Sequence, residues 1–179
     1  MSRLRVPVTQ HDHCLGPPNA AVTLVEYGDY ECPHCGLAHP IVKLVREHFG
    51  DNLQFVFRHF PLSQAHPNAE SAAEAAEYAG AHGRFWEMHD GIYENQDRLG
   101  LPLLFALVGA LGLSESDLRN ALVNGEYEPK VRGDFLGGVR SGVNGTPTFF
   151  INGQRHDGSY AFEDLVAGIE AHLHAMAPL

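Results

Sequence analysis

The hydrophobic positions along the chain change from a strand pattern to a helix pattern and back. Residues 21–27 are apolar and β-branched enough for a buried strand, and residues 53–60 alternate as a second strand should. The segment between them has the apolar spacing of an amphipathic helix, so the three elements predict a βαβ unit with parallel strands. The predicted buried face of that helix consists of Leu37, Ile41, Leu44, Val45 and Phe49.

A long middle segment shows helix patterns and no strand pattern. Its predicted helices cover residues 68–81, 84–95, 102–111 and 128–139. A further helix is predicted after Ser114, because Ser114 to Asp117 resembles a capping box.

The last part of the chain returns to strand. Residues 148–151 are followed by Asn152-Gly153, a strong hairpin signal, and by a short returning strand over residues 154–156. Residues 162–176 have the pattern of an amphipathic helix. The predicted element order is therefore βαβ, helical block, ββα, within one α/β domain.

This order divides the chain into four segments. We expect a polar surface arm, the first half of the sheet domain, an inserted helical block, and the second half of the sheet domain. Their limits are residues 1–19, 20–65, 66–141 and 142–179.

Composition narrows the classes of partner. The 179 residues are 44% hydrophobic and 19% charged, as in ordinary globular proteins. The formal net charge of -10, without any basic run, argues against binding to nucleic acid or to an anionic membrane surface. No segment has the ~18 consecutive apolar residues that membrane insertion requires. Residues 1–10 lack the apolar core of a signal peptide, so the chain as given is expected in the cytoplasm, or in the periplasm or outside the cell if a leader was removed.

The main chemical candidate is Cys32-Pro33-His34-Cys35, at the junction of the first strand and its helix. Two cysteines at this spacing can form and break a disulfide with little backbone movement. At a helix N-terminus the first thiolate is stabilised, so Cys32 is the predicted nucleophile and Cys35 the resolving thiol. His34 is expected to add hydrogen bonds or positive charge to that thiolate. The alternative, a zinc half-site, needs two further ligands at suitable spacing.

Glu26 lies six residues before Cys32 within the first strand. An acid in a buried strand is costly and therefore needs an explanation. With a raised pKa, its carboxyl group could take the proton from Cys35 when that thiol attacks a mixed disulfide. The alternative is that Glu26 faces solvent on an edge strand.

A proline opens the third strand, in Gly145-Thr146-Pro147-Thr148. If the bond before Pro147 is cis, the backbone of Thr146 could pair with an extended substrate segment beside the disulfide. An ordinary trans turn is the alternative, and the sequence leaves the isomer open.

Cys14 belongs to no recognised motif. It could trap a mixed disulfide, bridge two subunits, or form a weak metal site with the neighbouring His11 and His13. The simplest interpretation is an inert thiol on a flexible arm. No metal and no organic cofactor are expected, since a dithiol carries two electrons by itself.

Three segments in this order resemble the DsbA-like branch of the thioredoxin superfamily. They are Val25-Glu26-Tyr27 before the cysteine pair, Arg58-His59-Phe60-Pro61-Leu62 after the second strand, and Gly145-Thr146-Pro147-Thr148-Phe149. The resemblance covers residues 16–175. It implies a thioredoxin fold with a helical domain inserted between the second and third main strands, a cis Pro147 facing the disulfide, and Glu26 near the cysteines. It also implies exchange with protein or peptide substrates, usually as an oxidase outside the cytoplasm.

The predicted function is a thiol–disulfide oxidoreductase acting on protein or peptide thiols, with glutathione or a redox protein as a further partner. The sequence leaves oxidase, reductase and isomerase open, because cytosolic glutathione would keep an oxidising pair reduced. Two other classes compete: a redox-switched peptide-binding or chaperone-like module without turnover, and a glutathione-dependent transferase on the same fold.

Overall fold

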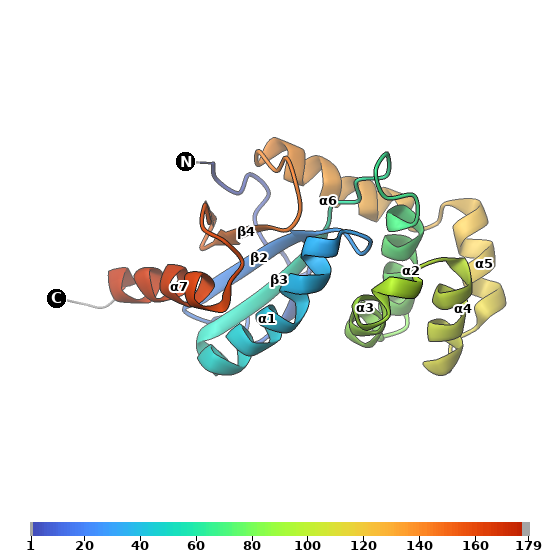
Figure 1. The fold of residues 1–179 in the computed structure, drawn as a ribbon, viewed down its shortest axis with the longest axis horizontal. Helices are drawn as coiled ribbons and strands as arrows, with labels where there is room; N and C mark the ends of the chain where they lie inside the picture. Colours follow the sequence, from blue (N-terminus) through green and yellow to red (C-terminus); the bar gives the residue numbers. More distant parts are fainter. Residues whose placement is uncertain (1, 177–179) are drawn as a thin grey trace.

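The computed structural model describes residues 2–176, which form a mixed β-sheet covered by helices (Figure 1). The five strands of this part of the chain lie in the order β1-β3-β2-β4-β5. Strand β2 is central, because it pairs in parallel with β3 and antiparallel with β4. The α/β thioredoxin fold with a helical insertion is confirmed. The strands are β1 (His13–Leu15), β2 (Val22–Gly28), β3 (Leu53–His59), β4 (Thr148–Ile151) and β5 (Gln154–Arg155).

Helix α1 (Pro33–Phe49) connects the two parallel strands as predicted, and α7 (Phe162–Met176) ends the described part of the chain. Five α-helices form the predicted helical block at one end of the sheet (Figure 1). They are α2 (Ala69–Ala81), α3 (Phe85–Glu94), α4 (Leu101–Ala110), α5 (Glu115–Asn124) and α6 (Glu128–Arg140), with single turns of 3-10 helix at Gly50–Asn52 and Gln96–Arg98. No helix within residues 2–176 is both long and apolar enough to span a membrane.

The buried face of α1 differs from the predicted one. Leu37 and Leu44 are 61% and 53% exposed, so their assignment to the core was wrong. The helix instead buries a row of side chains that lies about one position further along the sequence than the predicted row. Smaller and polar side chains of this row fit against the sheet and α3. The buried residues of α1 are Cys35, Ala38, His39, Val42, Val45 and Phe49.

Alternate residues of β2 serve two separate cores. Leu24 packs in the larger core together with residues of α1 and α7, such as Val45 and Ile169. Val25 and Tyr27 point to the opposite face, where a smaller core contains Val56, Phe60 and Phe150. Because side chains alternate along a strand, Glu26 lies on the Leu24 side, which is the side of α1.

The N-terminal segment contains a strand that the sequence pattern did not predict. Strand β1 pairs antiparallel with β3 at the edge of the sheet. The segment before it is held by the buried Arg58, which donates to both carboxylate oxygens of Asp12 at 2.8 and 3.0 Å and to the carbonyl oxygens of Val6 and Pro7. Its order therefore depends on a side chain far away in the sequence.

The remaining local predictions agree with the structure. Asn152 and Gly153 have φ values of 46° and 78°, as a tight hairpin turn requires, and β4 pairs with β5. Ser114 caps α5 by accepting a hydrogen bond from the backbone of Asp117 at 3.1 Å. Both features are encoded within a few neighbouring residues.

Candidate active site

The cysteine pair lies where β2 leads into α1. Cys32 is the N-cap residue of α1 and Pro33 occupies its first turn, where a missing backbone N–H costs nothing. Both cysteines are free thiols in the structure, Cys32 being 5% exposed and Cys35 fully buried. The geometry thus presents one sulfur near the surface and keeps the second behind it.

Several hydrogen bonds stabilise negative charge on Cys32. The Cys35 thiol is the strongest contributor, and contacts with Thr146 and the backbone N–H groups of Cys35 and His34 add to it. Together they outweigh burial and lower the pKa of Cys32 to about 5. At neutral pH this sulfur is a thiolate, the form that acts as nucleophile and as leaving group.

Cys35 has the opposite environment. Burial raises the pKa of its thiol well above the usual range, and the nearby Cys32 and Glu26 raise it further. The backbone N–H of Asp29 approaches its sulfur at 3.5 Å. Cys35 therefore retains its proton until a base removes it.

Glu26 is 3% exposed on the central strand, which excludes the edge-strand alternative. Burial raises the pKa of its carboxyl group to about 8, and the charge of Cys32 contributes. Glu26 also lines a small cavity of about 30 Å³ together with His39, His89 and Asp90. A cavity of this size can hold a water molecule.

The peptide bond between Thr146 and Pro147 is cis, as the resemblance implies. The Thr146 carbonyl oxygen lies 3.5 Å from the Cys32 sulfur, so the segment before β4 borders the thiol.

His34 lies between the cysteines, but its side chain is directed elsewhere. Its Nδ1 lies 2.9 Å from the hydroxyl group of Tyr160, in the loop before α7. The hydrogen bond that His34 contributes to Cys32 comes from its backbone N–H. The side-chain role expected for His34 stays a prediction, and Tyr160 is a neighbour that the sequence did not indicate.

Asp29 is a second residue that sequence reasoning missed. Its buried carboxylate accepts hydrogen bonds from the backbone of Glu31 and Cys32 through Oδ1, and from the backbone of Leu62 and the ring of His66 through Oδ2. An acid between the end of a strand and a Cys-X-X-Cys motif is the signal that could have indicated it. Asp29 holds the turn that presents Cys32.

Cys14 lies on β1, opposite Val56, rather than on a free arm. Burial raises the pKa of its thiol, and Asp12 adds to this effect. His13 does not join Cys14 but contacts Glu77 at 2.7 Å. An inert thiol remains the simplest interpretation of Cys14.

Two groups of side chains within the described residues have the composition of a metal site. His13, His59 and Glu77 form one, and His39, His89 and Asp90 form the other. In the first group both imidazoles donate to the same Glu77 oxygen at 2.7 Å, which already satisfies the carboxylate. Neither group includes a cysteine.

Known proteins similar to this chain agree with the fold. The thioredoxin family model matches residues 8–171. Solved structures with the same fold include BdbD from Bacillus subtilis (TM-score 0.87, 23% identity, covering 97% of this chain and 98% of that one). Another is α-DsbA1 from Wolbachia pipientis (TM-score 0.82, 21% identity, covering 96% of this chain and 95% of that one).

Curated relatives are larger proteins. A protein named Na(+)/H(+) antiporter NhaA 1 from Salinispora arenicola is 46% identical over 167 residues, which are 93% of this chain and 26% of that protein. A protein of the same name from Mycobacterium sp. (strain KMS) is 42% identical, over 90% of this chain and 27% of its own length. The chain thus spans about a quarter of the length of these relatives. With the family model matching most of its length, the chain belongs to the thioredoxin family and has the fold of its DsbA-like members.

Proposed function

We propose that this chain is a thiol–disulfide oxidoreductase that exchanges disulfides with protein or peptide thiols through Cys32 and Cys35. The observation that carries the proposal is the contrast between the two sulfurs. Cys32 has a pKa of about 5 at the surface end of the pair, whereas the thiol of the buried Cys35 has a raised pKa and Glu26 lies nearby.

In the reducing direction, the Cys32 thiolate attacks a substrate disulfide, forms a mixed disulfide and releases one substrate thiolate. Cys35 then gives its proton to ionised Glu26 and attacks the Cys32 sulfur. The Cys32–Cys35 disulfide forms, the second substrate thiolate leaves, and two electrons have passed to the substrate. In the oxidising direction the steps run backwards. A substrate thiolate attacks the Cys32 sulfur and Cys35 leaves, taking a proton from Glu26; the second substrate thiolate then attacks the substrate sulfur of the mixed disulfide, and Cys32 leaves as a thiolate.

The low pKa of Cys32 favours the oxidising direction. A stabilised thiolate stabilises the reduced protein, so its disulfide is a stronger oxidant than an ordinary one. We infer that the chain oxidises substrate thiols, with Thr146 and Pro147 bordering the extended segment that carries the substrate cysteine. Such a pair would stay oxidised only where glutathione does not reduce it, which favours a location outside the cytoplasm. Sodium–proton exchange is not proposed for this chain, because the match covers only about a quarter of the antiporters.

The deciding experiment is the equilibrium reduction potential of the pair in glutathione buffers. Cys14→Ser is used as the background, so that only Cys32 and Cys35 titrate. We expect a value less negative than ~-220 mV, the least negative end of the range for the cytosolic glutathione poise. A value near -300 mV, on the order of that of a stable structural disulfide, would contradict the oxidising direction.

The exchange reaction itself is tested in the same Cys14→Ser background. Cys32→Ser should abolish oxidation of a dithiol peptide, measured by chromatography after acid quenching. Exchange that persists in this variant would overturn the proposed function. Peptide binding that changes with redox state, without turnover, would favour the switched binding module instead.

A further inference from the structure

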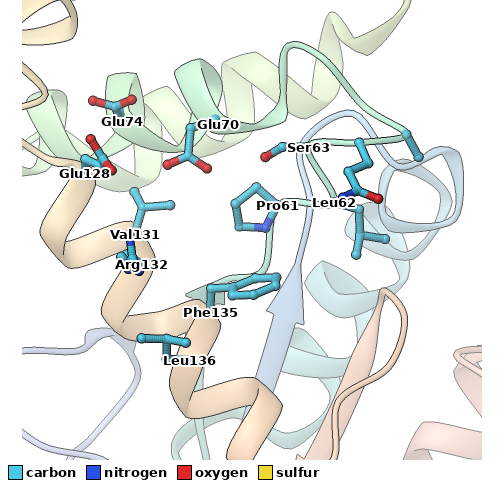
Figure 2. A pocket seen from close by; sticks show the side chains of 12 residues that line it. Pro61, Leu62, Ser63, Glu70, Glu74, Glu128, Val131, Arg132, Phe135 and Leu136 are labelled. Carbon is cyan, nitrogen blue, oxygen red and sulfur yellow. The ribbon is translucent and has the colours of Figure 1, made fainter.

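A pocket of about 890 Å³ lies between α2, α6 and the loop that follows β3 (Figure 2). Its lining is divided into two parts. Pro61, Phe135 and Leu136 form an apolar part, whereas the glutamates of α2 and α6 form an acidic part. Figure 2 shows the carboxylates of Glu70, Glu74 and Glu128 together at the end of the pocket away from Phe135 and Leu136.

No salt bridge neutralises the acidic part within the described structure, although the exposed Arg132 also lines the pocket. Among residues 2–176, Glu70, Glu74 and Glu128 form no salt bridge. Glu74 is 8% exposed, and its buried Oε2 atom has no hydrogen-bond partner among the described residues. Burial raises the pKa of Glu74 to about 7, and the charges of Glu70 and Glu128 add to this. A buried acceptor without a donor is costly, so a ligand that donates hydrogen bonds and carries positive charge would be stabilised here.

The arrangement is unsuited to a bare metal ion. The groups of described residues whose ligand atoms converge closely enough for a metal lie elsewhere and include none of these glutamates. The acidic part also borders an apolar surface that a hydrated ion would leave uncovered. The pocket instead matches an organic cation joined to apolar groups, such as a lysine or arginine beside an aliphatic or aromatic side chain.

The wall of the pocket is hydrogen-bonded to the turn that presents the nucleophile. Asp29 Oδ2 accepts from the backbone of Leu62 at 2.8 Å, and Asp29 Oδ1 accepts from the backbone of Cys32 at 3.2 Å. Leu62 itself lines the pocket. One carboxylate therefore connects the pocket with the redox centre, which places the pocket within reach of residues flanking a substrate cysteine.

We propose that this pocket selects substrate polypeptides in which a lysine or arginine beside an apolar residue lies close to the reacting cysteine. The inference rests on the proposed function, because it names the substrate class for the same redox centre. The apolar side chain lies against Pro61 and Phe135, and the cation meets Glu70 and Glu74.

The test separates binding from exchange. Two fluorescent peptides share their apolar residues and carry serine in place of cysteine; one has lysines and the other has glutamates around the serine. Their binding to the whole chain is measured by anisotropy, and exchange is measured with the corresponding cysteine peptides. The variant Glu70→Gln/Glu74→Gln removes the two α2 carboxylates. Glu163→Gln/Glu170→Gln, on the exposed face of α7, removes the same charge at a distance.

We expect the wild type to bind the lysine peptide about fivefold or more tightly than the glutamate peptide, the size of one partly buried charge pair. This preference should disappear in Glu70→Gln/Glu74→Gln and persist in the α7 control. Glu128 is exposed, so Glu128→Gln provides a second variant if the double variant folds poorly. It should reduce the preference for the lysine peptide partly.

Two results would overturn the inference: equal binding of both peptides by the wild type, or a preference that the α2 substitutions leave unchanged. Selective binding without exchange would instead refute the proposed function and leave the proposed selectivity of the pocket standing. Exchange without selectivity would retain the function and refute the pocket.

Discussion

Two buried glutamates, one behind the cysteines and one beneath the N-terminal strand, have opposite chemistry. The side chain of Glu26 forms no hydrogen bond with the described residues, and burial, followed by the charge of Cys32, raises the pKa of its carboxyl group to about 8. Burial acts on Glu77 too, but hydrogen bonds from His13 and His59 outweigh it and hold the pKa of Glu77 well below its usual range. Burial alone therefore does not determine the protonation of a carboxyl group; the donors around it do.

The difference assigns separate tasks to the two residues. Glu26 can gain or lose a proton near neutral pH, which suits a group that serves Cys35. Glu77 stays ionised and joins β1, β3 and α2 through two imidazoles. One site is suited to proton transfer and the other to holding the fold together.

The largest expected effect comes from Glu77→Gln. The substitution removes the charge that the two imidazoles surround, so we expect the free energy of unfolding at pH 7 to fall by about 4 kcal/mol. Urea denaturation measures this, with Glu47→Gln, an exposed position of α1, as the control. A loss no larger than that of the control would show that Glu77 is not held by its imidazoles.

Glu26→Gln should change the free energy of unfolding in the opposite direction, by raising it. The unfolded chain releases this proton near the ordinary value of 4.5, whereas the folded chain keeps it up to about pH 8. The stability that protonated Glu26 provides is therefore complete below pH 4.5 and is lost as the pH rises through 8. At pH 7 the glutamine variant should be more stable by about 3 kcal/mol.

Denaturation of both proteins at a series of pH values from 4.5 to 8 tests this prediction. The stability difference should grow across the series. Parallel curves would mean that Glu26 ionises in the folded chain as it does in the unfolded one.

The smallest expected effect is the loss of proton transfer. In Glu26→Gln the attack of Cys35 on a mixed disulfide should slow by ~100-fold, because the base that accepts its proton is missing. A single-turnover measurement starting from a preformed mixed disulfide at Cys32 isolates this step. Glu77→Gln serves as the matched control, and an equal slowing in both variants would attribute the effect to the fold rather than to Glu26.

Local sequence patterns predicted much of this structure, because interactions between neighbouring residues determine the elements concerned. The hairpin depends on the backbone freedom of Asn152 and Gly153, and α5 begins where Ser114 caps it. The spacing of Cys32 and Cys35 and their place at a strand-to-helix junction were likewise readable in one segment. Strand β1 was missed because its order depends on Arg58 and Glu77, more than forty residues away.

The sequence by itself determined the α/β order of elements, the redox pair and a family resemblance, since each follows from neighbouring residues. It could not choose the buried face of α1, where Leu37 and Leu44 are exposed while His39 is buried, because that choice depends on which elements cover the helix. It also could not distinguish Glu26 from Glu77. Only the tertiary structure placed two imidazoles beside one carboxylate and a thiolate near the other, and electrostatic interactions at short range depend on that placement.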